Sequence, residues 1–459
     1  MTQLEGIRDW IDRRVPEIVA AHQVPALSVA IGVGDAVVEW AGGTLNLATG
    51  VTATRGSAFQ IGSVTKVFTA TLVMQLVDDG LLDLDATVRD VLPGFRVEDE
   101  AASGCVTIRQ LLSHTSGFEG DVFVDTGPGD DCLERYVEVL ADAPQLFPPG
   151  EMFSYNNAGF SALGRAIEVL RGEPYDRVLR ERLLDPLGMR HAAVNAAEAI
   201  LHRTAVGHLV DEAGALAPTA VWAMERSGSP AGSVLAMSAG DLLSFGRMHL
   251  RGGVAGNGTR ILSAEGVTAM RQGQVALPDI DQGAAWGLGW ELFDRGGHEV
   301  IGHDGNTIGQ SAALRLIPGE DLVIALVANG GAPHPVFATI IDHVLQEFAG
   351  ITPPAAPAPT GPAPAASERY LGRYASSTAI TTITRAEGGR LWLDRTPHGV
   401  VAELGDLPYR TELVAWHPDV LFPLAPEGGR HQPVAFLGDD GTGRALYVHT
   451  GRADRRMSS

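Results

Sequence analysis

A proline- and alanine-rich stretch just after residue 350 limits how this chain can fold more than any other feature. It begins at Ile351 and reads Ile-Thr-Pro-Pro-Ala-Ala-Pro-Ala-Pro-Thr-Gly-Pro-Ala-Pro. Such a composition predicts an extended, semi-rigid linker. We therefore expect a linker at 351–367 that joins a large domain at 1–350 to a small domain at 368–459. A length of 459 residues also allows two or three domains of ordinary size.

Hydrophobic periodicity predicts strands at both ends of the large part and helices between them. The expected elements are a helix at 4–19, strands at 26–33 and 36–40, a buried helix starting near 63, a largely helical insert up to about 170, strands at 286–292, 300–313 and 322–328, and a helix at 336–348. The first two strands are separated by Gly34-Asp35, a pair typical of hairpin turns.

The residues after the linker change to short runs that alternate apolar and polar side chains. Such runs occur at 380–384, 391–393 and 445–448, and a Glu-Gly-Gly turn lies at 387–389. Short alternating strands separated by turns predict a small antiparallel barrel.

Net charge and terminal composition exclude several partners. The formal net charge is −21 and the pI is about 5.0, which argues against nucleic acid or an anionic membrane as a partner. The N-terminus is polar and acidic, unlike a signal peptide, and no apolar stretch reaches membrane-spanning length. We therefore expect a cytoplasmic protein, unless an export signal has been removed.

The sequence predicts neither a metal site nor a cofactor. Cys105 and Cys132 are the only cysteines, and they match no metal pattern or redox pair, so we expect free, buried thiols. No H-E-x-x-H pattern is present either.

Ser63 and Lys66 lie at the expected start of the buried helix. Lys66 is the only lysine in the chain, and a lysine amine can lose a proton and act as a base, whereas an arginine cannot. Residues three apart share a helix face, so the Ser63 hydroxyl and the Lys66 amine should be neighbours. This pattern favours a nucleophile with an adjacent base. The structural alternative is that Ser63 caps the helix and Lys66 is a solvated charge.

Three further positions are candidates for chemistry. Tyr155 and Asn157 follow a Pro-Pro-Gly turn and precede an apolar helix. Tyr155 could pass protons if a nearby ammonium lowered its pKa, and Asn157 could hold the Lys66 amine. His303 lies in a strand rich in small residues, which lets a ligand approach the backbone closely. Tyr155 could equally be a half-buried loop aromatic, and His303 a structural histidine.

Taken together, Ser63-x-x-Lys66, Tyr155-x-Asn157 and His303-x-Gly305 resemble the motifs of the serine β-lactamase and penicillin-binding-protein superfamily. The resemblance is greatest to its class C-like esterase and peptidase branch and covers roughly residues 1–350. It extends to the flanking phrases Leu-Leu-Ser-His-Thr-Ser-Gly at 111–117 and Arg-Ile-Leu-Ser at 260–263. The family implies an α/β fold, in which an antiparallel sheet with flanking helices adjoins a helical subdomain and the site lies between them. The module after the linker resembles a lipocalin-like β-barrel.

The resemblance also implies roles for single residues. Ser63 would be the acylated nucleophile and Lys66 its general base. Tyr155 would exchange protons with Lys66, and Asn157 would line the site.

The third motif departs from the usual Lys-Thr-Gly of the family. His303, Asp304 and Gly305 would offer the substrate a weaker cation beside an acid. The backbone N–H groups of Ser63 and Asn306 would form the oxyanion hole.

Among members of this superfamily, the chain looks like the penicillin-binding-protein-type thioesterases, stand-alone non-ribosomal peptide cyclases of the surugamide cyclase kind. These enzymes take a peptidyl chain from a carrier-protein thioester and close it head to tail, usually at a C-terminal D-residue. Arg444 or Arg452, part of a basic cluster at the end of the chain, could reach the site and hold the substrate. The cluster could equally be a solvated tail.

Two other functions stay open. A D-stereospecific peptidase or carboxylesterase would use the same Ser63 and Lys66 with water as acceptor. A non-catalytic sensor or binding protein would normally have lost one of the catalytic side chains.

Overall fold

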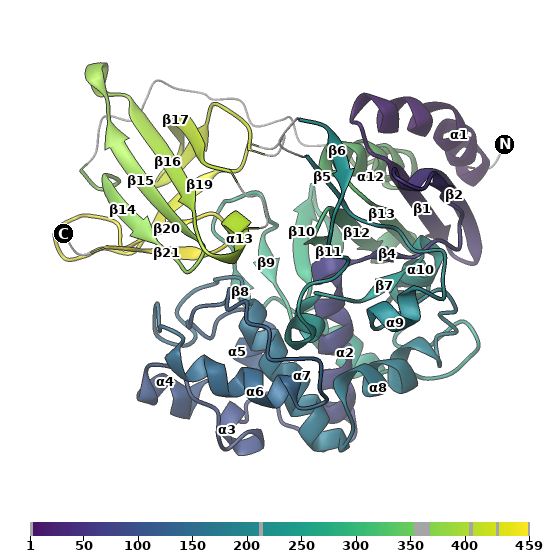
Figure 1. Cartoon of the computed structure of the whole chain (residues 1–459), viewed down its shortest axis with the longest axis horizontal. Helices are drawn as coiled ribbons and strands as arrows, with labels where there is room; N and C mark the ends of the chain where they lie inside the picture. Colours follow the sequence, from purple (N-terminus) through teal and green to yellow (C-terminus); the bar gives the residue numbers. More distant parts are fainter. Residues whose placement is uncertain (1–2, 211–213, 353–367, 404–406, 428–430, 458–459) are drawn as a thin grey trace.

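The protein is described by a computed structural model that covers residues 3–210, 214–352, 368–403, 407–427 and 431–457. A nine-stranded sheet forms its centre, with the strand order β3-β2-β1-β13-β12-β11-β10-β9-β8 (Figure 1). The strands are β1 (Ala26–Val33), β2 (Ala36–Asn46), β3 (Val51–Thr52), β8 (Val275–Ala276), β9 (Ala285–Trp286), β10 (Glu291–Arg295), β11 (His298–Thr307), β12 (Gln310–Ile317) and β13 (Leu322–Ala328).

Both faces of this sheet are covered by apolar residues. On one face, α1 (Gln3–Ala21) and α12 (Pro333–Ala349) pack against the sheet and form one hydrophobic core. On the other face, α2 (Thr65–Asp78) and α10 (Ala239–Leu250) contribute to a larger core. Every residue of β13 is buried because this strand lies in the middle of the sheet.

The helical part lies below the sheet in Figure 1 and continues the larger core. Its helices are α3 (Val88–Val91), α4 (Glu100–Cys105), α5 (Ile108–Leu112), α6 (Cys132–Val139), α7 (Asn157–Arg171), α8 (Tyr175–Leu179) and α9 (Ala196–Ala199). Outside it lie α11 (Ala264–Met270) and two small two-stranded sheets: β4 (Phe59–Gln60) with β7 (Ala236–Met237), and β5 (His208–Val210) with β6 (Leu216–Pro218).

The C-terminal part is a closed antiparallel barrel of eight strands, in which β14 pairs with β21. The strands are β14 (Gly372–Ala375), β15 (Ala379–Arg385), β16 (Leu391–Pro397), β17 (Tyr409–His417), β18 (Val420–Pro423), β19 (Val434–Leu437), β20 (Tyr447–His449) and β21 (Ala453–Arg456), with the short helix α13 (Val400–Glu403) between β16 and β17. The alternation of side chains gives the barrel its own core, which includes Tyr374, Ile383 and Phe436.

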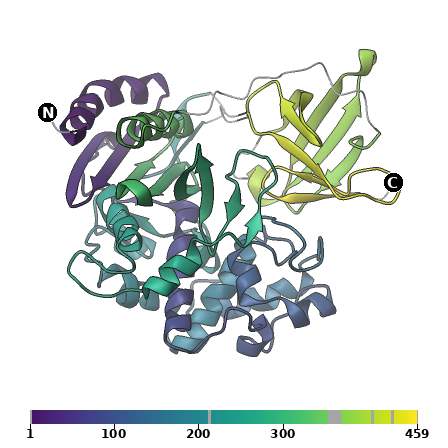
Figure 2. The same ribbon diagram turned by 180° about the vertical axis from the view of Figure 1, so that it is seen from behind.

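The barrel packs directly against loops of the large part, as seen from both sides in Figures 1 and 2. The Tyr447 hydroxyl donates to the Leu146 carbonyl at 2.9 Å, and the Tyr155 N–H donates to the Gly451 carbonyl at 2.9 Å. The loop between β20 and β21 is therefore fixed next to Tyr155.

The predicted fold class is confirmed: an α/β sheet with helices is followed by a small β-barrel. The linker prediction at 351–367 falls almost entirely outside the described residues, and the division into domains at 1–350 and 368–459 stays a prediction. The expected single strand at 300–313 is wrong, since these residues form β11 and β12, which pair antiparallel with a turn after Thr307. The expected strand at 286–292 is also wrong. The chain turns between β9 and β10, because Gly289 adopts a φ of +84° and the Gly287 N–H bonds to the Trp290 carbonyl.

The structure also bears on two expectations from composition. Cys132 is buried and free, but Cys105 is exposed, since it ends the short surface helix α4. Across the described ranges, no helix combines the length and apolarity needed to span a membrane, and no group of three potential metal ligands gathers.

Candidate active site

Ser63 lies in a 3₁₀ turn at Gly62–Val64 that leads directly into α2. The N-cap residues are Ile61 for this turn and Val64 for α2, so Ser63 caps neither element and the structural alternative of a helix cap does not apply. Gly62 has a φ of +51°, a conformation that side chains rarely adopt. This bend presents Ser63 at the start of the helix, next to β11.

Close packing between β11 and this turn brings two backbone N–H groups together. A Cβ atom on Gly305 would lie 1.9 Å from the Ile61 carbonyl oxygen and 3.0 Å from the Ser63 nitrogen. A Cβ atom on Gly62 would lie 2.6 Å from the Asn306 nitrogen. Only glycines allow this approach, and the result places the Ser63 and Asn306 amides on adjoining backbone segments.

Lys66 is completely buried, which excludes the alternative of a solvated charge. Its Nζ donates to the Ser63 Oγ at 3.1 Å, to the Asn157 Oδ1 at 2.7 Å and to the Ala231 carbonyl at 2.6 Å. Burial, and next the positive charge of Arg452, lower the pKa of the Lys66 amine well below its usual value, whereas Asp121 opposes them. The amine is thus held beside the serine hydroxyl and is easier to deprotonate than an ordinary lysine.

Tyr155 is half-buried, and its ring stacks on His114 with 4.4 Å between ring centres. The Lys66 Nζ lies over the Tyr155 ring, 4.8 Å from its centre. The condition that an ammonium lowers the Tyr155 pKa is not met. Burial raises the pKa of the phenol, and the Ser63 hydroxyl only partly opposes this. The phenol therefore enters any reaction protonated, and its buried oxygen has no hydrogen-bond partner of good geometry.

Asn157 links Lys66 to an acid that the sequence pattern did not reveal. Its Nδ2 donates to the Asp121 Oδ1 at 2.6 Å, and Asp121 is itself only 7% exposed. Asp121 also forms an ion pair with Arg452, whose Nη2 donates to the Asp121 Oδ1 at 3.1 Å. A continuous chain of polar contacts therefore runs from Ser63 to the barrel.

His303 is buried and neutral. Its Nδ1 donates to the Asp304 carbonyl at 2.6 Å, and burial, followed by the charge of Lys66, lowers the His303 pKa to about 3. The expectation that His303 offers the substrate a weak cation is therefore wrong at neutral pH. The ring instead adds to an aromatic wall with Tyr155 and Trp286.

Asp304 points to the other face of β11, because neighbouring strand residues alternate. Its carboxylate pairs with Arg315 at 2.7 Å. This placement argues against Asp304 as a substrate ligand, whereas Gly305 lies against Ser63.

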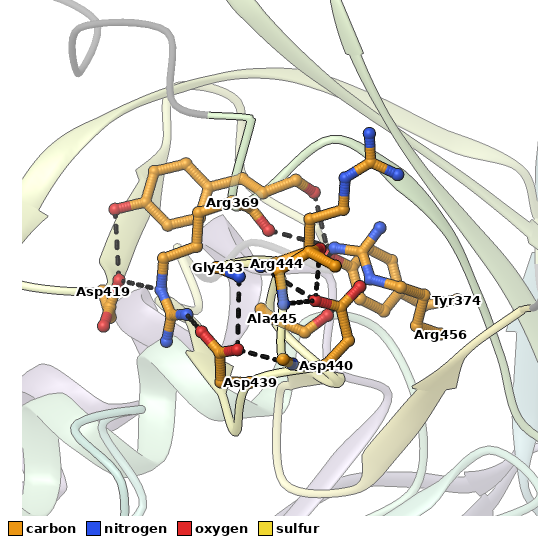
Figure 3. Close-up of polar contacts among 12 residues, drawn as sticks. Arg369, Tyr374, Asp419, Asp439, Asp440, Gly443, Arg444, Ala445 and Arg456 are labelled. Carbon is orange, nitrogen blue, oxygen red and sulfur yellow. Dashed lines mark hydrogen bonds and ion pairs between the residues drawn. The ribbon is translucent and has the colours of Figure 1, made fainter.

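The two candidate arginines lie at opposite ends of β20. The Arg452 guanidinium lies over the Tyr155 ring, 5.1 Å from its centre, and so reaches the site. Arg444 is exposed in the loop between β19 and β20, where its backbone N–H bonds to Asp440 (Figure 3). The prediction that Arg444 could contact the substrate is therefore not supported, and neither is the solvated-tail alternative for Arg452.

Comparison with known proteins agrees with this arrangement. The β-lactamase family profile matches residues 11–347, and the chain belongs to that family. Penicillin-binding protein 4 of Amycolatopsis lactamdurans is 46% identical over 354 residues, which cover 75% of this chain and 93% of that protein.

Solved structures extend the likeness to the barrel. SurE, a surugamide cyclase solved with D-Leu, is 29% identical with a TM-score of 0.78, covering 99% of this chain and 100% of SurE. A D-amino acid amidase from Ochrobactrum anthropi, complexed with L-phenylalanine amide, is 22% identical with a TM-score of 0.63 over 76% of this chain and 99% of the amidase, and shows the fold alone.

Proposed function

We propose that the chain is a penicillin-binding-protein-type thioesterase. It takes a non-ribosomal peptidyl thioester onto Ser63 and releases the peptide by head-to-tail macrolactamisation, favouring a D-configured C-terminal residue. The observation that carries this proposal is the likeness to SurE over 99% of the chain, which includes the barrel that reaches the site through Arg452. The D-Leu in the SurE structure supports the stereochemical preference.

In the first half-reaction, the Ser63 Oγ attacks the thioester carbonyl and its proton passes to the neutral Lys66 amine. The backbone N–H groups of Ser63 and Asn306 stabilise the oxyanion that forms. When the intermediate collapses, the thiolate leaves and takes a proton from the Lys66 ammonium. The product of this half-reaction is an ester between Ser63 and the peptide.

In the second half-reaction, the N-terminal amine of the same peptide attacks the ester carbonyl. The amine gives up a proton to Lys66, and the Ser63 oxygen is reprotonated as it leaves. The protonated Tyr155 phenol stands beside both groups and can donate to the leaving oxygen. The released product is a macrolactam, and the enzyme returns to its starting state.

The remaining side chains position the reacting groups. Asn157 fixes the Lys66 amine, and the neutral His303 ring closes one wall of the site. Arg452 would hold a carbonyl or phosphate oxygen of the substrate, since its guanidinium stands over Tyr155 and is partly exposed. The partner would be an acylated carrier protein of a non-ribosomal peptide synthetase.

A hydrolase is the second candidate: a D-stereospecific peptidase or carboxylesterase with the same acyl-enzyme and water as acceptor. The observation that favours it is the 46% identity to a penicillin-binding protein, whose match covers 75% of this chain. A non-catalytic binding protein is disfavoured because Lys66 is buried against Ser63 and Asn157.

Product analysis separates the two candidates. Linear peptide thioesters that end in a D-residue or in its L-diastereomer are mixed with the protein and with Ser63→Ala, and the products are weighed by mass spectrometry. The proposal predicts a product one water lighter than the free acid, formed from the D-thioester and absent with Ser63→Ala. Free acid as the sole enzymatic product would establish the hydrolase.

A further inference from the structure

The barrel encloses a cavity of about 310 Å³ that adjoins the candidate active site. Asp121 and Arg452, which connect the barrel to Asn157 and Lys66, form part of its lining. Small-ligand pockets start at roughly 300 Å³, so there is room for one amino-acid residue. This cavity has no role in the acylation chemistry described above.

The lining combines apolar walls with two buried carboxyl groups, Asp121 and Asp454. Leu393, Val434 and Val448 contribute apolar surface from β16, β19 and β20. Asp454 of β21 is only 9% exposed and accepts a hydrogen bond from the Thr381 hydroxyl at 3.4 Å.

Asp454 differs from the other charged residues of the lining. Arg395 pairs with Glu427 at 2.7 Å, and Arg452 pairs with Asp121. Among the described residues, no cation lies within ion-pairing distance of Asp454. A buried carboxylate without a cation is costly, and burial raises the pKa of Asp454 to about 7. Arg395 and Arg452 lower the pKa of Asp454 electrostatically, but they pair with Glu427 and Asp121, so a ligand could supply the direct cationic contact that Asp454 does not have.

We propose that the barrel cavity binds the free α-amino end of the peptide substrate, with the ammonium hydrogen-bonded to Asp454 and the N-terminal side chain against Leu393, Val434 and Val448. This inference rests on the proposed function and gives the place where the N-terminal amine of the peptide is bound before it attacks the acyl group on Ser63. An α-ammonium has one positive charge and three donors, which match the carboxylate and the hydroxyl of Thr381. The apolar walls suit an aliphatic side chain.

Proton loss from the bound ammonium follows from the same contact. The ammonium proton passes to the Asp454 carboxylate, which leaves a neutral amine and a neutral carboxylic acid. Burial brings the pKa of Asp454 to about 7, nearer to the roughly 7.7–8.0 of an α-amino group, which makes Asp454 a better proton acceptor than an ordinary carboxylate. The neutral amine can then move past Arg452 to the acyl group on Ser63.

Calorimetry with a minimal probe tests the site without any turnover. L-Leucinamide has the free amine, and N-acetyl-L-leucinamide lacks it; each is titrated into the Ser63→Ala protein. We expect the acetylated probe to bind at least tenfold more weakly. Equal affinities for the two probes would overturn the proposal, whatever the behaviour of the variants below.

Variants locate the binding in the cavity. In the Ser63→Ala background, Asp454→Asn should weaken leucinamide binding at least tenfold. Asp394→Asn is the matched control, because Asp394 lies beside Leu393 on β16 but pairs with Arg410, outside the lining of the cavity. Unchanged binding in Asp454→Asn, or equal losses in the two variants, would contradict the assignment.

A third variant keeps the test decisive where Asp454→Asn does not fold. Leu393→Phe fills the cavity without changing its charge and should weaken leucinamide binding. Full affinity in a folded Leu393→Phe protein would place the probe elsewhere and refute the proposal.

Turnover links this site to cyclisation. With the linear peptidyl thioester, Asp454→Asn should release a larger fraction as free acid than the wild-type protein does. Should the wild-type protein itself form no lactam, the cyclase function fails, and calorimetry still decides whether the cavity binds an amine.

Discussion

Arg452 and Asp121 should shift the pH dependence of acylation in opposite directions. Arg452 lowers the pKa of Lys66, and Asp121 raises it. Arg452→Gln should therefore move the acid limb of the kcat/KM profile to higher pH, because more lysine is protonated at a given pH. Asp121→Asn should move it to lower pH. A purely structural role of the ion pair would not give opposite signs.

The size of the effect follows from the positions of the two cations. Lys66 Nζ and Arg452 Cζ lie 4.8 and 5.1 Å from the centre of the Tyr155 ring, so they are no more than about 10 Å apart. Coulomb's law with an effective dielectric constant of about 20 gives roughly 1.7 kcal/mol at that distance. Because the Arg452 side chain is 39% exposed, screening leaves about 1 kcal/mol. That energy changes the neutral fraction of Lys66 roughly fivefold on the acid limb.

The assay is acylation by p-nitrophenyl butyrate between pH 5 and 9, followed as the burst of p-nitrophenolate. This ester is too small to need the barrel, so changes in substrate binding contribute little. Arg444→Gln is the matched control, since it removes an exposed arginine at the far end of β20. The reasoning would be refuted if the acid limb of the pH profile moved in the same direction in Arg452→Gln and Asp121→Asn. It would also be refuted if Arg444→Gln shifted the acid limb as much as Arg452→Gln does.

Three further predictions concern single positions. Gly305→Ala should reduce kcat/KM roughly 100-fold or more, because the new Cβ would lie 1.9 Å from the Ile61 carbonyl and push β11 away from the oxyanion site, whereas Gly319→Ala, in open space, should have no effect on the same assay. Lys66→Arg should lower acylation by roughly 10²–10⁴-fold at neutral pH in rapid-mixing experiments, since a guanidinium cannot take the serine proton; a near-normal rate would exclude Lys66 as the base. Asp454 has a pKa of about 7 when folded and an ordinary value of 3.8, so between these pH values the folded protein holds a proton that the unfolded chain has lost. Its contribution to stability should therefore fall by up to roughly 4 kcal/mol as the pH rises from 4 to 7. Urea denaturation between pH 4 and 7 should show a smaller fall in the free energy of unfolding for Asp454→Asn than for the wild-type protein. An equal fall in the two proteins would contradict the raised pKa of Asp454.

Local spacing sufficed to predict the Ser63–Lys66 contact and the start of α2. Both residues lie on one helical turn, so the distance of 3.1 Å between Oγ and Nζ follows from the sequence separation. The alternating runs after residue 370 likewise predict a barrel, because side-chain alternation is a local property of strands.

Contacts between distant segments could not be predicted in the same way. Asp121 and Arg452 are 331 residues apart, and a single aspartate in a loop has no recognisable pattern. The raised pKa of Tyr155 and the lowered pKa of His303 could not be predicted from the sequence either. The direction of a pKa shift depends on burial and on where the charge stands relative to the ring, and neither is encoded in spacing.

The most direct test of the account is to trap the acyl-enzyme and find the residue that carries it. The protein is mixed with a linear peptidyl thioester, quenched in acid within milliseconds to seconds, digested and mapped by mass spectrometry, with Ser63→Ala and Lys66→Arg in parallel. The account predicts a peptidyl adduct on Ser63 that forms and decays at the rate of turnover, is absent in Ser63→Ala and forms slowly in Lys66→Arg. An adduct on another residue, or undiminished turnover in Ser63→Ala, would contradict it.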